Sequence, residues 1–200
     1  MANTIDIQQL YVAYFNRPAD AAGLTYWSGV LDTNPNALQD ISRAFAASAE
    51  YRAEYVGDSN REIVDEVYEN LFNRDADAAG LNYWTDLLNR NIVTIDNVVA
   101  EISAAAVGND KIVFDGKVAV AALFTERLDL PNEQAAYAGN AAIDLVEDFL
   151  ETIKDQATVT AALSTGAVDW VISRVLGANT FGADIELVGV QTDIEPAPVF

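Results

Sequence analysis

Apolar side chains recur every three or four positions along most of the chain, which is the spacing of one face of an α-helix. Between residues 7 and 15, for example, Ile7, Leu10, Tyr11, Tyr14 and Phe15 form one such stripe. Stripes of the same kind occupy residues 24–31, 38–46, 64–72, 81–88, 95–102, 118–128, 143–153 and 168–175. The pattern therefore predicts an all-α protein.

The first two helices of this pattern occur twice, at a spacing of 57 residues. Residues 10–27 read LYVAYFNRPADAAGLTYW and residues 67–84 read VYENLFNRDADAAGLNYW, with 12 of 18 positions identical. In each copy an aspartate, Asp20 or Asp77, stands where it can cap the second helix. We therefore predict two tandem related helical repeats, each of which packs against the other.

The helical stripes continue after the second copy, and the pattern changes only near the C-terminal end. Residues 183–190 alternate between apolar and polar or small side chains, which is typical of extended chain, and the last residues resemble a linker. The predicted units are repeat 1 (residues 1–58), repeat 2 (59–110), a helical cap packed on the repeats (111–177) and an extended tail or linker (178–200).

The net charge of the chain limits the classes of partner that it can bind. Eleven Lys and Arg stand against 31 Asp and Glu, so the formal net charge is −20, and we expect no nucleic-acid partner because phosphate backbones would be repelled. No apolar run approaches the roughly 20 residues that cross a bilayer, so we expect a chain that does not span a membrane. The N-terminal residues lack the pattern of a cleaved signal peptide, so any export is expected to use another route.

Cysteine and histidine are both absent. Thiolate nucleophiles, zinc–thiolate sites and imidazole bases are therefore excluded within this chain. Pairs of carboxylates such as Glu147 and Asp148 resemble the pair used by glycosidases, but 31 acidic residues produce such pairs by chance. We predict that the chain is not an enzyme.

The repeated segment resembles the bacterial family of domains of unknown function numbered 4214. Residues 11–27 carry its aromatic helix, then Arg, Pro, Asp, two residues, Gly-Leu and Tyr-Trp, and residues 68–84 repeat this with Asp75 in place of Pro. The later stretch 117–150 is similar to the region after this motif in many secreted members. The resemblance covers roughly residues 5–155.

The resemblance implies a role outside the cell. Members of the family occur in large exported proteins, often beside calcium-binding repeats and type I secretion signals. The module also resembles the N-terminal lipopolysaccharide-binding anchor domain of S-layer proteins. The implied function is a secreted, non-enzymatic anchor on the outer-membrane exterior of a Gram-negative bacterium. Its implied partners are lipopolysaccharide O-antigen and copies of itself in a lattice. The alternative is a protein–protein assembly module of a secreted adhesin or biofilm-matrix protein.

Three aspartates suggest a calcium site. Asp75, Asp77 and Asp86 stand at positions 1, 3 and 12 of a loop with Gly80 at position 6, as in an EF-hand. The competing interpretation is that Asp77 only caps a helix, and it is favoured because capping also explains Asp20 in the first copy.

Five residues are candidates for contact with a sugar. Arg17 and Arg74 occupy the same place in both copies, either to bind an anionic sugar or to hold helix-end carbonyls and the capping aspartate, and the second role is favoured. Tyr51, Tyr55 and Tyr137 are expected to be exposed aromatic residues able to stack on a sugar ring.

Overall fold

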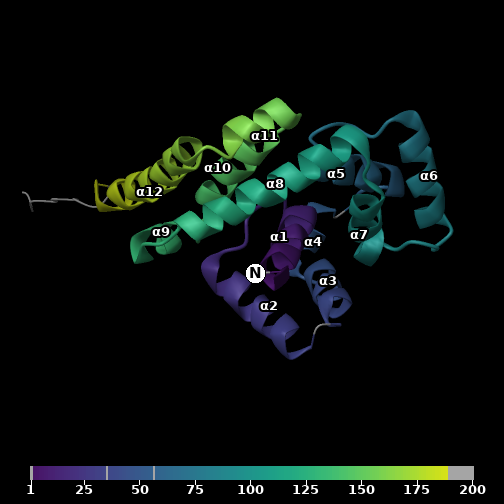
Figure 1. Cartoon of the computed structure of the whole chain (residues 1–200), viewed down its shortest axis with the longest axis horizontal. Coiled ribbons are helices and arrows are strands. Elements are labelled where there is room, and N and C mark those ends of the chain that lie inside the picture. The colour runs from purple at the N-terminus through teal and green to yellow at the C-terminus, as the bar shows by residue number, and fades with distance from the viewer. Residues whose placement is uncertain (1, 35, 56, 189–200) are drawn as a thin grey trace, which may run out of the picture.

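The computed structural model describes residues 2–34, 36–55 and 57–188, and within these ranges the protein is helical and contains no strand (Figure 1). The helices are α1 (Ala2–Phe15), α2 (Ala21–Thr33), α3 (Leu38–Ala46), α4 (Ala49–Glu54), α5 (Asn60–Phe72), α6 (Ala78–Asn89), α7 (Ile95–Ala105), α8 (Gly108–Arg127), α9 (Pro131–Ala136), α10 (Asn140–Glu151), α11 (Gln156–Ala162) and α12 (Thr165–Val188). This confirms the all-α prediction.

Helix α8 runs through the middle of the molecule, where it contacts α1 and α5 and also α10, α11 and α12 (Figure 1). Different faces of α8 enter different cores: Phe114 packs with α1–α7, Val120 with α10 and α11, and Phe124 with α9, α10 and α12. A helix that is apolar on most sides has to be surrounded by others. The apolar stretch 118–128 is thus the second half of a longer helix that begins at Gly108, inside predicted repeat 2.

The two copies of the repeated segment match in their hydrogen bonds at the same spacing of 57 residues. The backbone N–H of Ala19 donates to the Gln8 side chain at 3.0 Å, and that of Ala76 donates to the Asp65 carboxylate at 2.9 Å. Both segments end their first helix on an asparagine in the left-handed region, Asn16 at φ 48° and Asn73 at φ 53°. The sequence identity therefore extends to the same local geometry.

Each copy begins its second helix in the same way. The Asp20 carboxylate accepts from the backbone N–H of Gly23 at 2.8 Å, and the Asp77 carboxylate accepts from that of Gly80 at 2.9 Å. A Cβ atom added at either glycine would overlap the hydroxyl oxygen of the preceding helix's tyrosine. These glycines therefore allow close packing of the two helices rather than an unusual backbone angle.

The C-terminal part differs from the prediction at one place. Helix α12 continues through Val188, so residues 178–188 are helical and the prediction of an extended tail from 178 is wrong for them. A short alternation is weak evidence for extended chain when the preceding helix can simply continue, and nothing between Gly177 and Val188 is a proline. The remaining tail, 189–200, lies outside the described residues.

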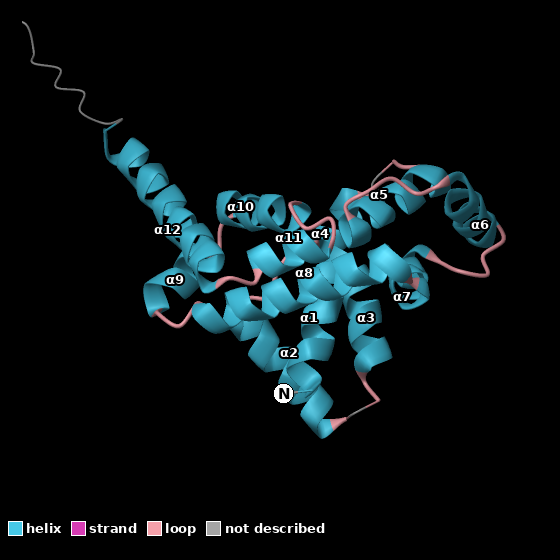
Figure 2. Cartoon of the chain, turned by 45° about the horizontal axis from the view of Figure 1, so that its top comes forward, coloured by secondary structure: helices cyan, strands magenta, loops and turns pink. Residues whose placement is uncertain are grey.

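Helices α6 and α12 lie at opposite ends of the molecule (Figure 2). Among the described residues, no single helix has both the length and the apolar composition needed to cross a membrane. Helix α11 and the first part of α12 meet the composition criterion only as a pair, and they are bent by 63°.

Candidate functional site

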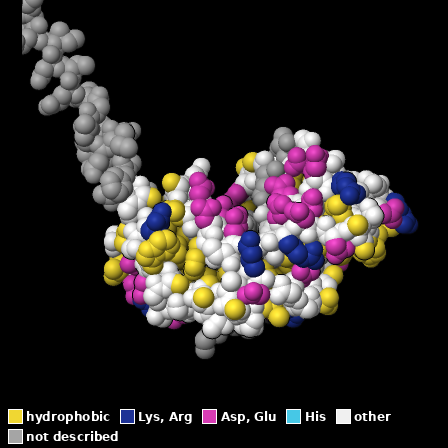
Figure 3. All heavy atoms as spheres, turned by 90° about the horizontal axis from the view of Figure 1, so that it is seen from above, with side chains coloured by type: hydrophobic (Ala, Val, Ile, Leu, Met, Phe, Trp, Pro, Cys, Tyr) yellow, Lys and Arg dark blue, Asp and Glu magenta, His cyan; other side chains and the backbone are white. Residues whose placement is uncertain are grey.

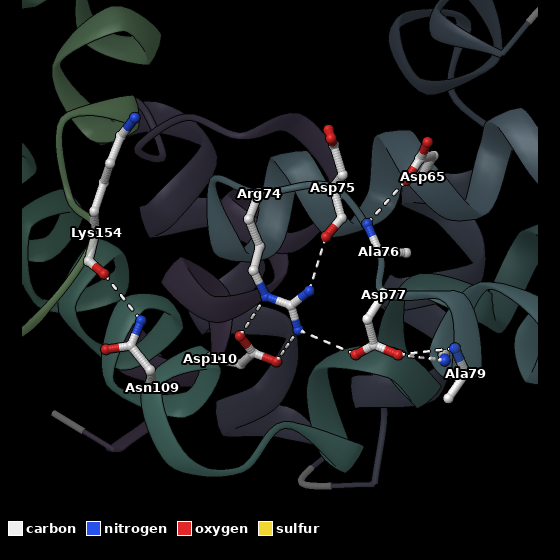
Figure 4. Close-up of polar contacts among 10 residues, drawn as sticks. Asp65, Arg74, Asp75, Ala76, Asp77, Ala79, Asn109, Asp110 and Lys154 are labelled. Carbon is white, nitrogen blue, oxygen red and sulfur yellow. Dashed lines mark hydrogen bonds and ion pairs between the residues drawn. The ribbon is translucent and has the colours of Figure 1, made fainter.

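Each repeated segment holds an arginine in the turn between its helices, and each arginine binds a carboxylate from the first turn of a later helix. Arg17 Nε and Nη2 lie 2.7 and 3.1 Å from the two carboxylate oxygens of Glu50 in α4. Arg74 Nε and Nη2 lie 2.8 and 2.7 Å from those of Asp110 in α8 (Figure 4). Paired hydrogen bonds of this kind fix orientation as well as distance. Each arginine therefore ties its turn to a helix further along the chain.

The surroundings of the two arginines are also alike. Each guanidinium lies over the tyrosine of its own first helix, 5.2 Å from the Tyr11 ring centre and 5.1 Å from that of Tyr68. Each Nη1 donates to the carbonyl of the next residue in the turn. Arg74 also lies 3.9 Å from the capping carboxylate of Asp77. The favoured structural role of the arginines thus agrees with these contacts, although their main partners come from distant helices.

The two sites differ in burial. The Arg17 side chain is only 10% exposed, whereas that of Arg74 is 37% exposed. The hydroxyl of Tyr137 donates to the Pro18 carbonyl at 2.9 Å, next to the bond that Arg17 makes with the same oxygen. The prediction that Tyr137 is exposed is therefore wrong, because it fills the core beside the Arg17 turn. Burial raises the pKa of Tyr137, which keeps the hydroxyl a donor.

Tyr51 and Tyr55 are also buried, contrary to the prediction that they are exposed. Their rings lie 4.8 Å apart, and Tyr51 lies 5.3 Å from Tyr14 of α1. The Tyr51 hydroxyl donates to the backbone carbonyl of Ile95 at 2.7 Å. The two tyrosines predicted to stack on a sugar ring instead pack between α1, α4 and the start of α7.

The three aspartates proposed as calcium ligands do not form an EF-hand loop, because residues 78–89 are the helix α6. Asp77 caps that helix, and Asp86 lies within it and pairs with Arg90 at 3.0 Å. No group of three or more acidic side chains within the described ranges is arranged to hold a metal ion. Asp75, Asp77 and Asp86 therefore do not fit the predicted calcium site.

Beside the Arg74 turn lies a polar groove of about 300 Å³ between the C-terminal ends of α5 and α10. Its lining residues are Glu69, Asn70, Asn73, Arg74, Asp75, Glu151 and Lys154. Acidic side chains gather on both sides of a hollow in the face shown in Figure 3, with basic side chains beside them. The groove brings together Arg74 and Asp75 of the predicted site residues, while Arg17 and the three tyrosines lie in the core.

Hydrogen bonds connect the helices that form the walls of the groove. The Asn73 amide nitrogen donates to the carbonyls of Leu150 and Ile153 at 2.8 and 2.7 Å, which joins α5 to the end of α10. The ammonium of Lys117, wholly buried in α8, donates to the Asn70 carbonyl at 2.5 Å and to the Asn73 side-chain oxygen at 2.8 Å. The groove is thus preformed by three helices that are distant in sequence.

Burial, and secondly the neighbouring acidic groups, shifts the pKa values of ionisable side chains in this region. Burial raises the pKa of Glu69, and a hydrogen bond shared with Asp75 raises it further. Burial and then the neighbouring Asp144 raise the pKa of Glu147 to about 7. Burial lowers the pKa of Lys117 to about 7, against the opposing effect of Glu151 and Glu147.

Sequence reasoning missed most of the groove. Glu69, Glu151 and Lys154 carry no motif, and only the fold brings them together. Lys117 did leave a signal, because it is the only basic residue in the mostly apolar stretch 112–124, which otherwise carries a single charge at Asp115. A lysine between Gly116 and Val118 in a buried helix needs acceptors nearby, and this alone could have marked it.

The fold and the groove define a helical scaffold with a preformed polar groove. The family model described as "Domain of unknown function (DUF4214)" matches residues 2–55 and 42–106. These matches together span more than half of the chain, so the chain belongs to this family. The match confirms the resemblance seen in the repeated segment. No curated protein and no solved structure matches the chain.

Proposed function

We propose that the chain is a non-catalytic anchoring domain of an S-layer protein that binds cell-surface polysaccharide. The proposed ligand is the O-antigen of lipopolysaccharide, and the proposed location is the outer-membrane exterior of a Gram-negative bacterium. The observation that carries the proposal is the preformed polar groove beside Arg74, with its mixed lining of carboxylates, amides and basic groups.

The lining of the groove suits a ligand rich in hydroxyl groups. A sugar hydroxyl both donates and accepts, so it can bond to the carboxylates of Glu69 and Glu151 and to the ammonium of Lys154 in the same site. A ligand of a single polarity would leave one set of these groups unsatisfied on binding. The mixed lining therefore favours a polysaccharide over an apolar or purely anionic ligand.

The rigidity of the groove also supports binding. Asn73 and Lys117 connect its walls through bonds of 2.8 Å or less, so little ordering is needed when a ligand enters. A preformed site loses less conformational entropy on binding. The proposed export, lattice assembly and S-layer context rest on the family resemblance rather than on this geometry.

The test is a pull-down with intact cells of the producing organism and with matched cells that lack O-antigen. We expect the purified protein to bind the first and not the second. The double variant Glu69→Gln/Glu151→Gln should lose most binding, while Glu101→Gln, an exposed change of the same kind on α7, should retain it. Equal binding to both cell types would contradict the proposal.

A second candidate, a protein–protein assembly module, is favoured by one observation. The end of the molecule formed by α6, α7 and their loops exposes apolar side chains at Tyr83, Ile92, Ile95 and Val107. Large apolar side chains exposed at one end of a molecule favour an interaction surface there. Under this alternative, the double variant Ile92→Lys/Val107→Lys would abolish self-association in light scattering and leave polysaccharide binding unchanged.

A further inference from the structure

A second hollow lies between α10 and α12, outside the groove described above. Its volume is about 280 Å³. The lining residues that matter for its chemistry are Leu145, Asp148, Phe149, Thr152, Trp170 and Arg174. It combines an apolar floor with a carboxylate, a hydroxyl and a guanidinium.

Trp170 is exposed in a way that the other tryptophans are not. It is 58% exposed, whereas Trp84 is buried and Trp27 packs partly buried against the main core. A tryptophan left largely in water forgoes a large gain in burial. Its exposure at the edge of a hollow points to a surface that is covered by something else.

Arg174 has an aromatic ring as its partner, and among the described residues Arg52, Arg61, Lys117 and Lys154 also form no ion pair. Arg17, Arg74 and Arg127 each pair with a carboxylate, whereas Arg174 lies over the Trp170 ring at 4.9 Å and makes no ion pair within the described part of the chain. Asp148 likewise has no basic partner among the residues described. In a protein with net charge −20, a cation left without a carboxylate keeps its donors for a ligand.

The hollow adjoins the polar groove. Glu151 lines the groove and Thr152 lines the hollow, and these neighbours form the last turn of α10 and its cap. The two depressions therefore lie on either side of the C-terminal end of one helix. A polymer strand that occupies the groove needs to pass only this helix end to reach Trp170.

We infer that the hollow around Trp170 is a saccharide subsite that holds a further sugar of the polysaccharide strand bound in the polar groove. This inference rests on the proposed function. The apolar face of a sugar ring packs on the indole, as aromatic side chains combine apolar contact with polar surroundings. Asp148 accepts from ring hydroxyls, and Arg174 donates to hydroxyls or to a sugar carboxylate.

The inference is tested with O-antigen polysaccharide cleaved from purified lipopolysaccharide of the producing organism. Binding is measured by calorimetry and by tryptophan fluorescence, in which the exposed Trp170 should shift to shorter wavelength as the sugar excludes water. Trp170→Leu should weaken binding roughly threefold to tenfold, the value of an aromatic contact, and should abolish most of the shift. Trp170→Phe should retain intermediate affinity.

The matched control is Tyr83→Leu, because Tyr83 is 59% exposed but lies on α6, at the opposite end of the molecule. It should bind as the unaltered protein does, and thermal melting checks that all variants fold. If Trp170→Leu binds normally while Glu69→Gln/Glu151→Gln does not, the subsite is overturned and the proposed function stands. If the unaltered protein binds no polysaccharide, the proposed function fails and the subsite with it.

Discussion

The ammonium of Lys117 and the side-chain oxygen of Asn73 lie 2.8 Å apart in the interior of the molecule, where no water-exposed surface of the lysine remains. This bond joins the central helix α8 to the left-handed turn that ends α5. The same lysine also donates to the Asn70 carbonyl. A neutral amine can still donate both bonds, so these contacts do not require the lysine to be charged.

The free energy of unfolding should therefore rise with pH because the pKa of Lys117 is lower in the folded protein than in the unfolded chain. Burial lowers its pKa from 10.5 to about 7, so between these values the unfolded chain binds more protons than the folded one. The free energy of unfolding then increases with pH, by at most about 1.4 kcal/mol per pH unit from this group. Urea denaturation between pH 7 and 9.5 should show this rise in the unaltered protein, and Lys117→Met should remove it.

The two motif arginines should differ in their effect on stability despite their similar contacts. Arg17→Gln removes a nearly buried guanidinium and should cost about 2–3 kcal/mol, because the Glu50 carboxylate and the Tyr11 ring lose their partner. Arg74→Gln removes a more exposed one and should cost about 1 kcal/mol. Chemical denaturation of both variants measures the difference, and equal losses would contradict it.

Asp77 should act as a helix cap and not as a calcium ligand. Its carboxylate accepts from the backbone N–H groups of Ala79 and Gly80, which lowers its pKa. Asp77→Ala should lower the melting temperature by about 2–4 °C through loss of the cap, equally with calcium or with chelator present. Asp86→Ala, which removes an exposed pair with Arg90, should change stability by less than about 0.5 kcal/mol. A melting temperature that calcium raises in the unaltered protein but not in Asp77→Ala would instead restore the ligand interpretation.

The sequence could predict elements whose evidence is local. The stripe from Ile7 to Phe15 and its copy in α5 become buried faces, and the capping aspartates precede α2 and α6 as expected. Hydrophobic spacing and caps depend on neighbours a few positions away, so one sequence is enough to read them. The spacing of 57 between the copies added a second, independent observation of each feature.

The candidate site could not be predicted, because its contacts cross long stretches of chain. Arg17 meets Glu50 across 33 positions, and Lys117 meets Asn73 across 44. Nothing local distinguishes Glu50 or Glu151 from the other acidic residues. The burial of Tyr51 and Tyr137 was missed for a related reason. Short helices beside a turn show too little periodicity to reveal which of their faces is buried.

Gly80 and Gly29 should respond to alanine in opposite directions, although both lie within the second helix of their own repeat. Alanine normally stabilises a helix interior by about 1 kcal/mol relative to glycine. Nothing lies near a Cβ at Gly29, so Gly29→Ala should be stabilising by about 0.5–1 kcal/mol.

At Gly80, a Cβ would lie 2.5 Å from the Tyr68 hydroxyl oxygen, so the helices must separate or the ring must move. Gly80→Ala should therefore destabilise by about 1–2 kcal/mol. Tyr68→Phe removes the obstructing oxygen. The double variant should therefore lose less free energy of unfolding than the two single variants lose together. Denaturation of all four proteins completes the cycle, and additive losses would show that Gly80 is kept for a reason other than its contact with Tyr68.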